Sequence, residues 1–173
     1  MLESVFAHVQ GLWFRLTFIV ALCFFVHWEF LDHYFMWDDF GWIESALQST
    51  SFFDYAYRWI TIPQYYYRPV GHILSYFHIV AIGPFPFWHN VVSIFAHALC
   101  AVMLYGLVFE LYRRPVTAFL SAVFFIFSTA YSLMPVWACQ IYEPLGAYLF
   151  LLAALFLFAK GLRLWQVGGS GLT

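Results

Sequence analysis

Charged residues are scarce in this sequence. Only 9% of its 173 residues are Asp, Glu, Lys or Arg, whereas 64% are apolar and 24% are aromatic. The mean hydropathy is +0.79. A soluble domain has about a quarter of its residues charged, so that water covers its surface. The composition therefore excludes an ordinary soluble domain, and we expect a protein whose surface faces the lipid bilayer and that binds no nucleic acid.

Several sequence motifs are also lacking. The chain has no internal repeat, low-complexity tract, coiled-coil heptad or phosphate-binding glycine loop. Its three cysteines lie far apart in apolar surroundings, without the CxxC spacing of a metal site, which predicts packing residues (Cys23, Cys100 and Cys139). The N-terminal region carries Glu3 instead of lysines and has no small-x-small cleavage site, so we expect a retained first span rather than a signal peptide.

Apolar runs dominate what is present. A membrane-spanning helix needs about 20 residues, and four segments reach that length: 12–30, 88–110, 116–134 and 138–159. A fifth segment, 70–83, is shorter and lies between Arg68-Pro69 and Gly83-Pro84. The sequence therefore predicts an all-α transmembrane bundle over residues 1–163, with about four spans, followed by a short flexible tail over 164–173.

The basic residues predict an orientation, because Lys and Arg concentrate in cytoplasmic loops. With four spans and the N-terminus inside, four basic residues fall on the cytoplasmic side: Arg113, Arg114, Lys160 and Arg163. If 70–83 also crossed, Arg113 and Arg114 would lie outside. We therefore expect 70–83 to form a helix that lies at the outer interface or re-enters the membrane, within one long outer loop over 31–87.

This loop opens with an acidic pair, Asp38-Asp39, between Trp37 and Phe40. Partial desolvation and mutual repulsion would raise the pKa of at least one carboxyl, which suits a general base that acts on a hydroxyl. Adjacent carboxylates can also hold a divalent cation. The third interpretation is a solvated turn or a helix N-cap, in which the acids are simply kept out of lipid.

Tyr67-Arg68 follows in the same loop. Arg58 and Arg68 are arginines on the expected outer side, against the positive-inside trend. A guanidinium at the depth of the lipid headgroups suits bidentate contact with phosphate. The alternative is an interfacial anchor of aromatic residues with a snorkelling arginine.

Histidines and one acid complete the candidate residues. His72, His78, His89, Asn90 and His97 lie on or before the second span. Polar groups inside a span are costly and usually face the bundle interior, so we favour hydrogen bonding between helices over a zinc site, for which no ligand spacing is evident. Glu143, in a short second outer loop, has the environment of a cap or packing residue, and Pro144 can start or kink the last span.

Taken together, these features resemble the N-terminal part of a GT-C glycosyltransferase, the integral-membrane class that uses polyprenyl- or dolichyl-phosphate-linked sugars. Asp38-Asp39 stands where that family has its acidic pair, just after the first span. Tyr67-Arg68-Pro69-Val70, followed by His89-Asn90 and His97, is similar to the pattern of protein O-mannosyltransferases with tetratricopeptide repeats and of their bacterial relatives. Glu143 falls on the family's second acidic position, and Ile141 replaces an arginine common in the relatives.

The resemblance implies transfer of a sugar to a hydroxyl of an acceptor protein or glycan on the outer face of the membrane. Asp38 would be the base, and Asp39 would orient it or the acceptor. Arg68 would balance the phosphate leaving group, Glu143 would close the site, and Tyr67, His89 and Asn90 would contact the donor. No cofactor follows from the sequence beyond the divalent cation that the acids could hold.

Two other classes of function stay open. The acids could attract cations to a transporter or channel subunit, although the middles of the spans are nearly free of charge. The chain could also be a non-catalytic scaffold, since its end in Gly168–Thr173 predicts a truncation, a fragment or a degenerate copy, which could be inactive alone. We expect the bacterial inner membrane, ahead of the endoplasmic reticulum.

Overall fold

The computed structural model describes residues 2–36, 38–61, 69–128 and 144–169. Within those ranges the regular elements are all helical, which confirms the predicted all-α class. The elements are α1 (Leu2–Val26), the short 3-10 helix η1 (Trp28–Asp32), α2 (Asp38–Gln48), α3 (Phe52–Thr61), α4 (Pro69–Ile82), α5 (Pro86–Tyr112), α6 (Pro115–Phe127) and α8 (Pro144–Gly169).

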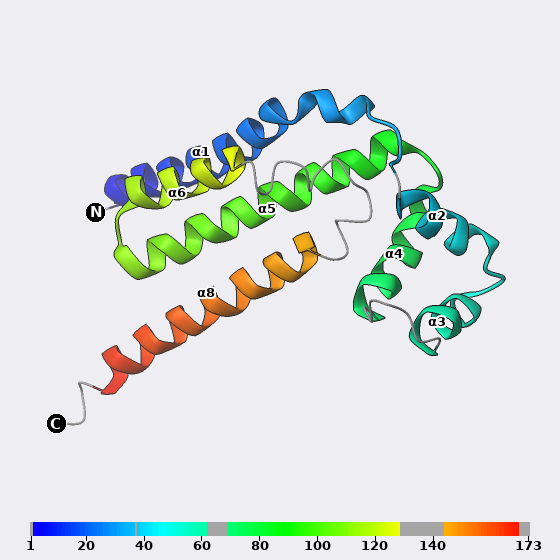
Figure 1. Cartoon of the computed structure of the whole chain (residues 1–173). Coiled ribbons are helices and arrows are strands. Elements are labelled where there is room, and N and C mark those ends of the chain that lie inside the picture. The colour runs from blue at the N-terminus through cyan, green and yellow to red at the C-terminus, as the bar shows by residue number, and fades with distance from the viewer. Residues whose placement is uncertain (1, 37, 62–68, 129–143, 170–173) are drawn as a thin grey trace.

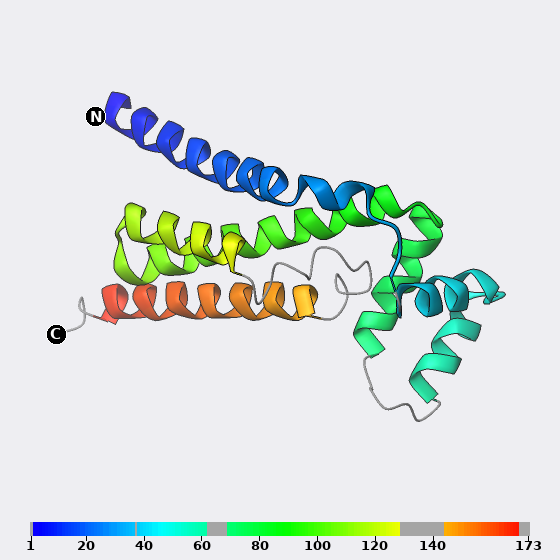
Figure 2. The same ribbon diagram turned by 45° about the horizontal axis from the view of Figure 1, so that its top comes forward.

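Four helices lie side by side and form the body of the molecule. α5 contacts α1, α6 and α8, and the ribbon reverses direction from each of these four helices to the next (Figures 1 and 2). Both termini therefore lie at one end of the bundle. α2, α3 and α4 pack together at the opposite end, beside the start of α5 (Figure 2).

Prolines and one left-handed residue set the helix ends. Pro86 and Pro115 lie in the first turns of α5 and α6. The N–H groups of a first turn have no acceptor within the helix, so proline, which lacks an N–H, breaks no helical hydrogen bond there. α8 begins at Pro144, as the sequence suggested. Arg113 ends α5 with φ of 55°, and its N–H donates to the carbonyl of Phe109 at 2.9 Å. Only Arg113 and Arg114 separate α5 from α6, so these two helices form a tight antiparallel pair.

Small and branched apolar side chains fill the contact between α1, α5 and α6. The buried cluster contains Ile19, Cys23, Ile94, Ala98, Ala101, Tyr105, Ala118, Ala122 and Ile126. Its four alanines bring the helix backbones close together, which is how helices associate in a lipid environment where the hydrophobic effect gives little drive.

A second core holds α2, α3 and α4 together. Tyr55 is fully buried there with Ile43, Ala46, Phe35 and Ile79. The imidazole of His72, on α4, also stacks with two tryptophan rings, Trp42 of α2 at 4.3 Å and Trp59 of α3 at 4.1 Å between ring centroids. The segment 70–83 is thus a helix, as predicted, and it is the element on which α2 and α3 pack.

Two helices are long and apolar enough to cross a membrane, Pro86–Tyr112 and Gly146–Gln166. None of the most apolar stretch of the second is buried within the protein, unlike the core helix of a soluble protein. Soluble monomers rarely expose continuous apolar surface of this kind. Among the predicted spans, 12–30 covers the end of α1, which stops at Val26, and η1, which follows it, whereas 116–134 and 138–159 lie partly outside the described residues.

Candidate functional site

The loop after η1 delivers the acidic pair to the start of α2. The Asp39 side chain is 1% exposed. Its carboxylate accepts the N–H of Met36 at 3.1 Å, while its own N–H donates to the Met36 carbonyl at 3.0 Å. These two bonds close the turn and fix the carboxylate in place. Asp38 is the first residue of α2, and its side chain lies outside the described part of the structure.

His89 is the partner that the fold brings to Asp39. The ring is fully buried near the start of α5, and its Nε2 lies 2.8 Å from the carbonyl of Gly83. Since a carbonyl only accepts, Nε2 carries the proton and donates, which leaves Nδ1 with a lone pair. Within the described part of the chain, that Nδ1 has no hydrogen-bond partner. The Asp39 carboxylate acts electrostatically on this imidazole.

A second imidazole lies against the first. The rings of His78, on α4, and His89 are 4.6 Å apart between centroids. Burial, and then the neighbouring His89, lower the pKa of His78 from 6.5 to about 4. The His78 ring is therefore neutral at physiological pH. The carboxylate of Asp39 acts on His89, and His78 and Phe35 pack against the His89 ring.

Asn90 secures this arrangement from the next position of α5. Its side-chain amide donates to the carbonyl of His33 at 2.8 Å and approaches that of Leu31 at 3.4 Å. The side chain thereby ties the start of the outer loop to α5. The bond joins α5 to the backbone that follows η1, and it makes Asn90 a positioning residue.

The structure brings together only part of the predicted site. Asp39, His89 and Asn90 lie at one junction between the outer loop and α5. Tyr67, Arg68 and Glu143 lie outside the described residues. Arg58, the other arginine of the outer loop, makes an exposed ion pair with Asp54 on the same helix, at 3.0 Å between Nη2 and Oδ2.

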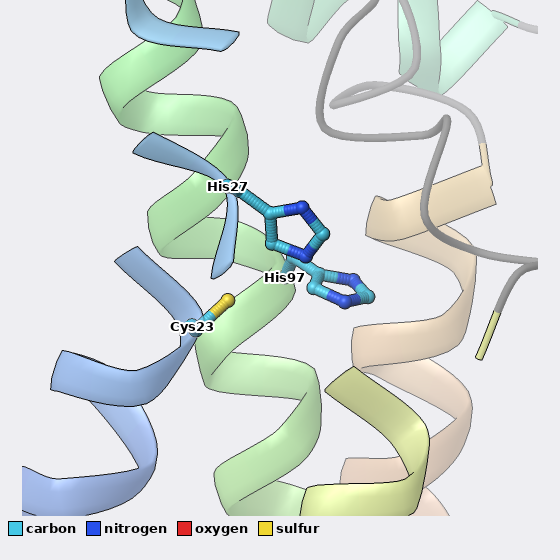
Figure 3. A group of neighbouring side chains, drawn as sticks. All are labelled: Cys23, His27 and His97. Carbon is cyan, nitrogen blue, oxygen red and sulfur yellow. The ribbon is translucent and has the colours of Figure 1, made fainter. Parts of the chain in front are cut away.

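The structure also shows a group of side chains that the sequence interpretation missed. Cys23 and His27, at the end of α1, lie beside His97 of α5, and all three are buried (Figure 3). Neither ring nitrogen of His97 has a hydrogen-bond partner among the described residues, so the helix-to-helix bond predicted for this residue is not seen there. The Cys23-x3-His27 spacing, which places both residues on one helix face, was the available clue.

Similarity to known proteins does not indicate a function. A scan against protein-family models, a search of curated proteins and a search of solved structures each find no match to this chain. Its function is therefore inferred from its own residues and their geometry.

Proposed function

We propose that this chain is a membrane glycosyltransferase, or the N-terminal part of one, that moves a sugar from a polyprenyl- or dolichyl-phosphate donor to an acceptor hydroxyl outside the cytoplasm. One observation carries the proposal. The carboxylate of Asp39 is buried and held beside His89 at the start of α2, directly after the acidic neighbour Asp38. Burying a carboxylate costs free energy unless the group is paired and hydrogen-bonded, so we infer that the fold keeps Asp39 for a role at this site.

The arrangement of the helices supports four spans with this junction on the outer face. α1, α5, α6 and α8 alternate in direction, so the α5–α6 turn and the end of α8 lie at the same end of the bundle as both termini (Figure 1). Arg113 and Arg114 form the turn between α5 and α6, and Lys160 and Arg163 lie in the second half of α8, toward that end. Arg163 of α8 lies 3.1 Å from the Glu110 carboxylate of α5. Since basic residues favour the cytoplasmic side, α2–α4 lie on the other.

The chemistry follows from the residue types. The Asp38 carboxylate takes the proton of the acceptor hydroxyl, whose oxygen then attacks the anomeric carbon of the donor sugar. The bond between that carbon and the phosphate oxygen breaks, and the electron pair leaves with the lipid phosphate. Arg68 balances the charge of this leaving group. Asp39 acts through position, because its bonds to Met36 fix the turn that carries Asp38.

The remaining predicted residues complete the donor site. His89 contributes a buried imidazole beside Asp39, and Asn90 holds the entrance of the loop. In this proposal Tyr67 contacts the donor and Glu143 closes the site. The membrane supplies the donor, and the bacterial inner membrane is the setting we favour, with the loop in the periplasm.

The test compares Asp38→Asn with Asp32→Asn, a matched change at an exposed acid of the same outer region. Membranes containing each variant receive polyprenyl-phosphate mannose with a radioactive sugar and a serine- and threonine-containing acceptor peptide. We expect Asp38→Asn to abolish transfer while insertion and donor retention stay as in the wild type, and Asp32→Asn to transfer normally.

Two results would contradict the proposal. Transfer retained by Asp38→Asn would remove the base from its assigned role. Failure of the wild-type protein to retain polyprenyl-phosphate mannose above polyprenyl alcohol would favour a non-catalytic scaffold, because the phosphate and sugar would then have no site.

A further inference from the structure

The buried group formed by Cys23, His27 and His97 is set apart from the Asp39 junction. The N–H of His27 donates to the carbonyl of Cys23 at 3.1 Å, so the turn of α1 continues to His27 and both side chains leave the same face. His97 approaches from α5 (Figure 3). One ligand atom from each residue, the sulfur of the cysteine and a ring nitrogen of each histidine, lies within 4.8 Å of the others.

The two imidazoles are buried without the partners that such groups normally have. His27 is 1% exposed and His97 is 0% exposed. Within the described part of the chain, none of their four ring nitrogens makes a hydrogen bond, although the carbonyl of Ile126 lies near the His27 ring. Buried polar groups are hydrogen-bonded in the large majority of proteins. Two buried imidazole rings whose nitrogens make no hydrogen bond therefore indicate a ligand that binds those nitrogens.

Ring contacts account for only part of the arrangement. The His27 and His97 rings meet edge to face at 5.3 Å between centroids, and His97 stacks with Phe125 at 4.8 Å. These contacts use the ring faces and one edge. They leave nitrogen lone pairs unused, and a leucine or phenylalanine would fill the same space without burying a polar atom.

We propose that Cys23, His27 and His97 bind a thiophilic metal ion, Cu⁺ in preference to Zn²⁺. Imidazole nitrogen and thiolate sulfur suit copper and zinc, whereas Mg²⁺ and Ca²⁺ require oxygen ligands. At metal–ligand distances of about 2.0 to 2.3 Å, as for zinc, ligand atoms are about 3.5 Å apart. The three side chains reach that separation by converging about 1 Å through rotation of their own torsions.

Charge decides between the two ions. Among the described residues, the groups that act electrostatically on the trio are its own members, the thiol of Cys100 and the backbone carbonyl of Ile126. The Sγ of Cys23 now contacts the carbonyl of Ile94 at 3.7 Å as a weak thiol donor. On binding, the thiol releases its proton to solvent, and the metal takes the thiolate. One thiolate and two neutral imidazoles make a neutral site with Cu⁺ but leave a net positive charge with Zn²⁺, which a membrane interior disfavours.

The experiment uses the full chain in lipid nanodiscs, in a Cys100→Ser, Cys139→Ser background where Cys23 is the remaining thiol. The protein receives Cu⁺ under anaerobic reducing conditions, or Zn²⁺ in parallel, and is then dialysed against a chelator. We expect one copper per chain, sulfur and nitrogen neighbours in the X-ray absorption spectrum of the copper, and a higher melting temperature with copper. Zinc should be removed.

Cys23→Ser and His97→Leu each remove one ligand. Even residues that only orient a metal ligand cost about 10- to 100-fold in affinity when changed, so we expect each variant to lose at least about 100-fold and to show no melting shift with copper. His97→Leu should fold, because leucine suits the apolar core. The melting temperature of the metal-free variant checks that it does. His33→Gln, a change at an exposed histidine, is the matched control and should keep the copper.

Three results would overturn the assignment. Copper retained by both Cys23→Ser and His97→Leu would place it elsewhere. Zinc retained in preference to copper would contradict the charge argument. If the wild-type chain retains zinc while the Cys100→Ser, Cys139→Ser background binds no metal, the site is a zinc site that uses a second thiolate, and the proposed three-ligand copper site is wrong.

Discussion

The side-chain amide of Asn90 donates a hydrogen bond of 2.8 Å to the backbone carbonyl of His33, across 57 positions of the sequence. The contact joins the second turn of α5 to the chain that has just left η1. The outer loop from Tyr34 onward follows this point, so Asn90 fixes the place from which the chain runs toward Asp39.

Replacing Asn90 with alanine removes this hydrogen bond between α5 and the outer loop. A net hydrogen bond contributes about 0.5 to 1.5 kcal/mol, and leaving a buried partner unsatisfied adds to the loss, so we expect Asn90→Ala to lower the free energy of unfolding by about 1 to 2 kcal/mol. Chemical unfolding in detergent measures it. Ser121→Ala is the control, because the Ser121 hydroxyl donates within its own helix α6, to the carbonyl of Thr117 at 2.9 Å. Equal losses for the two variants would contradict the role of Asn90.

The backbone conformation of Gly83 predicts a second effect on the junction between the outer loop and α5. Its φ is 73°, where L side chains are strained, and an added Cβ would lie 3.4 Å from the Phe85 ring. Its carbonyl also receives the His89 bond. The left-handed conformation costs about 1 to 2 kcal/mol for a residue other than glycine, so Gly83→Ala should lower the melting temperature in nanodiscs and disturb transfer.

Gly41 supplies the matched change. It lies in α2, and a Cβ there would meet nothing within 4 Å. Alanine in a helix is more favourable than glycine by about 0.5 to 1 kcal/mol, so Gly41→Ala should raise the melting temperature. A loss as large as that of Gly83→Ala would show that backbone strain is not the cause.

Apolar run lengths and prolines were sufficient to predict much of the fold. The helix over 70–83 is observed as α4 (Pro69–Ile82), and the run from 88 is observed within α5 (Pro86–Tyr112). Both depend on local sequence, in which a proline sets the start and apolar length sets the extent. The first predicted span, 12–30, is displaced from the observed helix, since α1 covers Leu2–Val26 and the chain then continues as η1 (Trp28–Asp32).

The composition of the candidate sites depends on which helices pack against each other. A local sequence pattern does not contain that information. The acidic pair was evident from its position after an apolar run, but its partner His89 lies 50 positions from Asp39 in the sequence. Cys23 and His97 looked like a packing residue and a hydrogen-bonding residue because each was considered on its own helix. Only the pairing of α1 with α5 brings them together.

His78 predicts how stability depends on pH. Its pKa in the folded protein is lowered to about 4, by burial first and then by His89, whereas in the unfolded chain it is about 6.5. Between these values the unfolded state binds the extra proton, so stability is full above pH 6.5 and is lost as the pH falls toward 4. Because the ring is only partly buried, we expect a loss of about 1 to 3 kcal/mol.

The measurement is a series of unfolding curves from pH 7.5 to 4.5. His78→Phe should flatten the slope below pH 6.5, since the buried imidazole is gone. His33→Gln, at an exposed position, should leave it unchanged. An unaltered slope in His78→Phe would mean that other groups carry the pH dependence.

Three groups in the second core form a hydrogen-bonded chain. The Ser75 hydroxyl donates to the carbonyl of His72 at 2.8 Å, so it accepts from the buried hydroxyl of Tyr55, which lies 2.8 Å away. Tyr55→Phe removes a donor and leaves the serine bonded to His72, which should cost about 1 kcal/mol. Ser75→Ala leaves the Tyr55 hydroxyl without its acceptor, and burial of that group should cost about 1 to 3 kcal/mol.

The double variant separates these contributions. Tyr55→Phe with Ser75→Ala removes both partners, so no hydroxyl is left unsatisfied, and the loss should be smaller than the sum of the two single losses by about 0.5 kcal/mol or more. Unfolding in nanodiscs measures all three free energies, with Tyr34→Phe, a change at an exposed ring, as the control for loss of a phenol. Additive losses would show that the two hydroxyls do not interact.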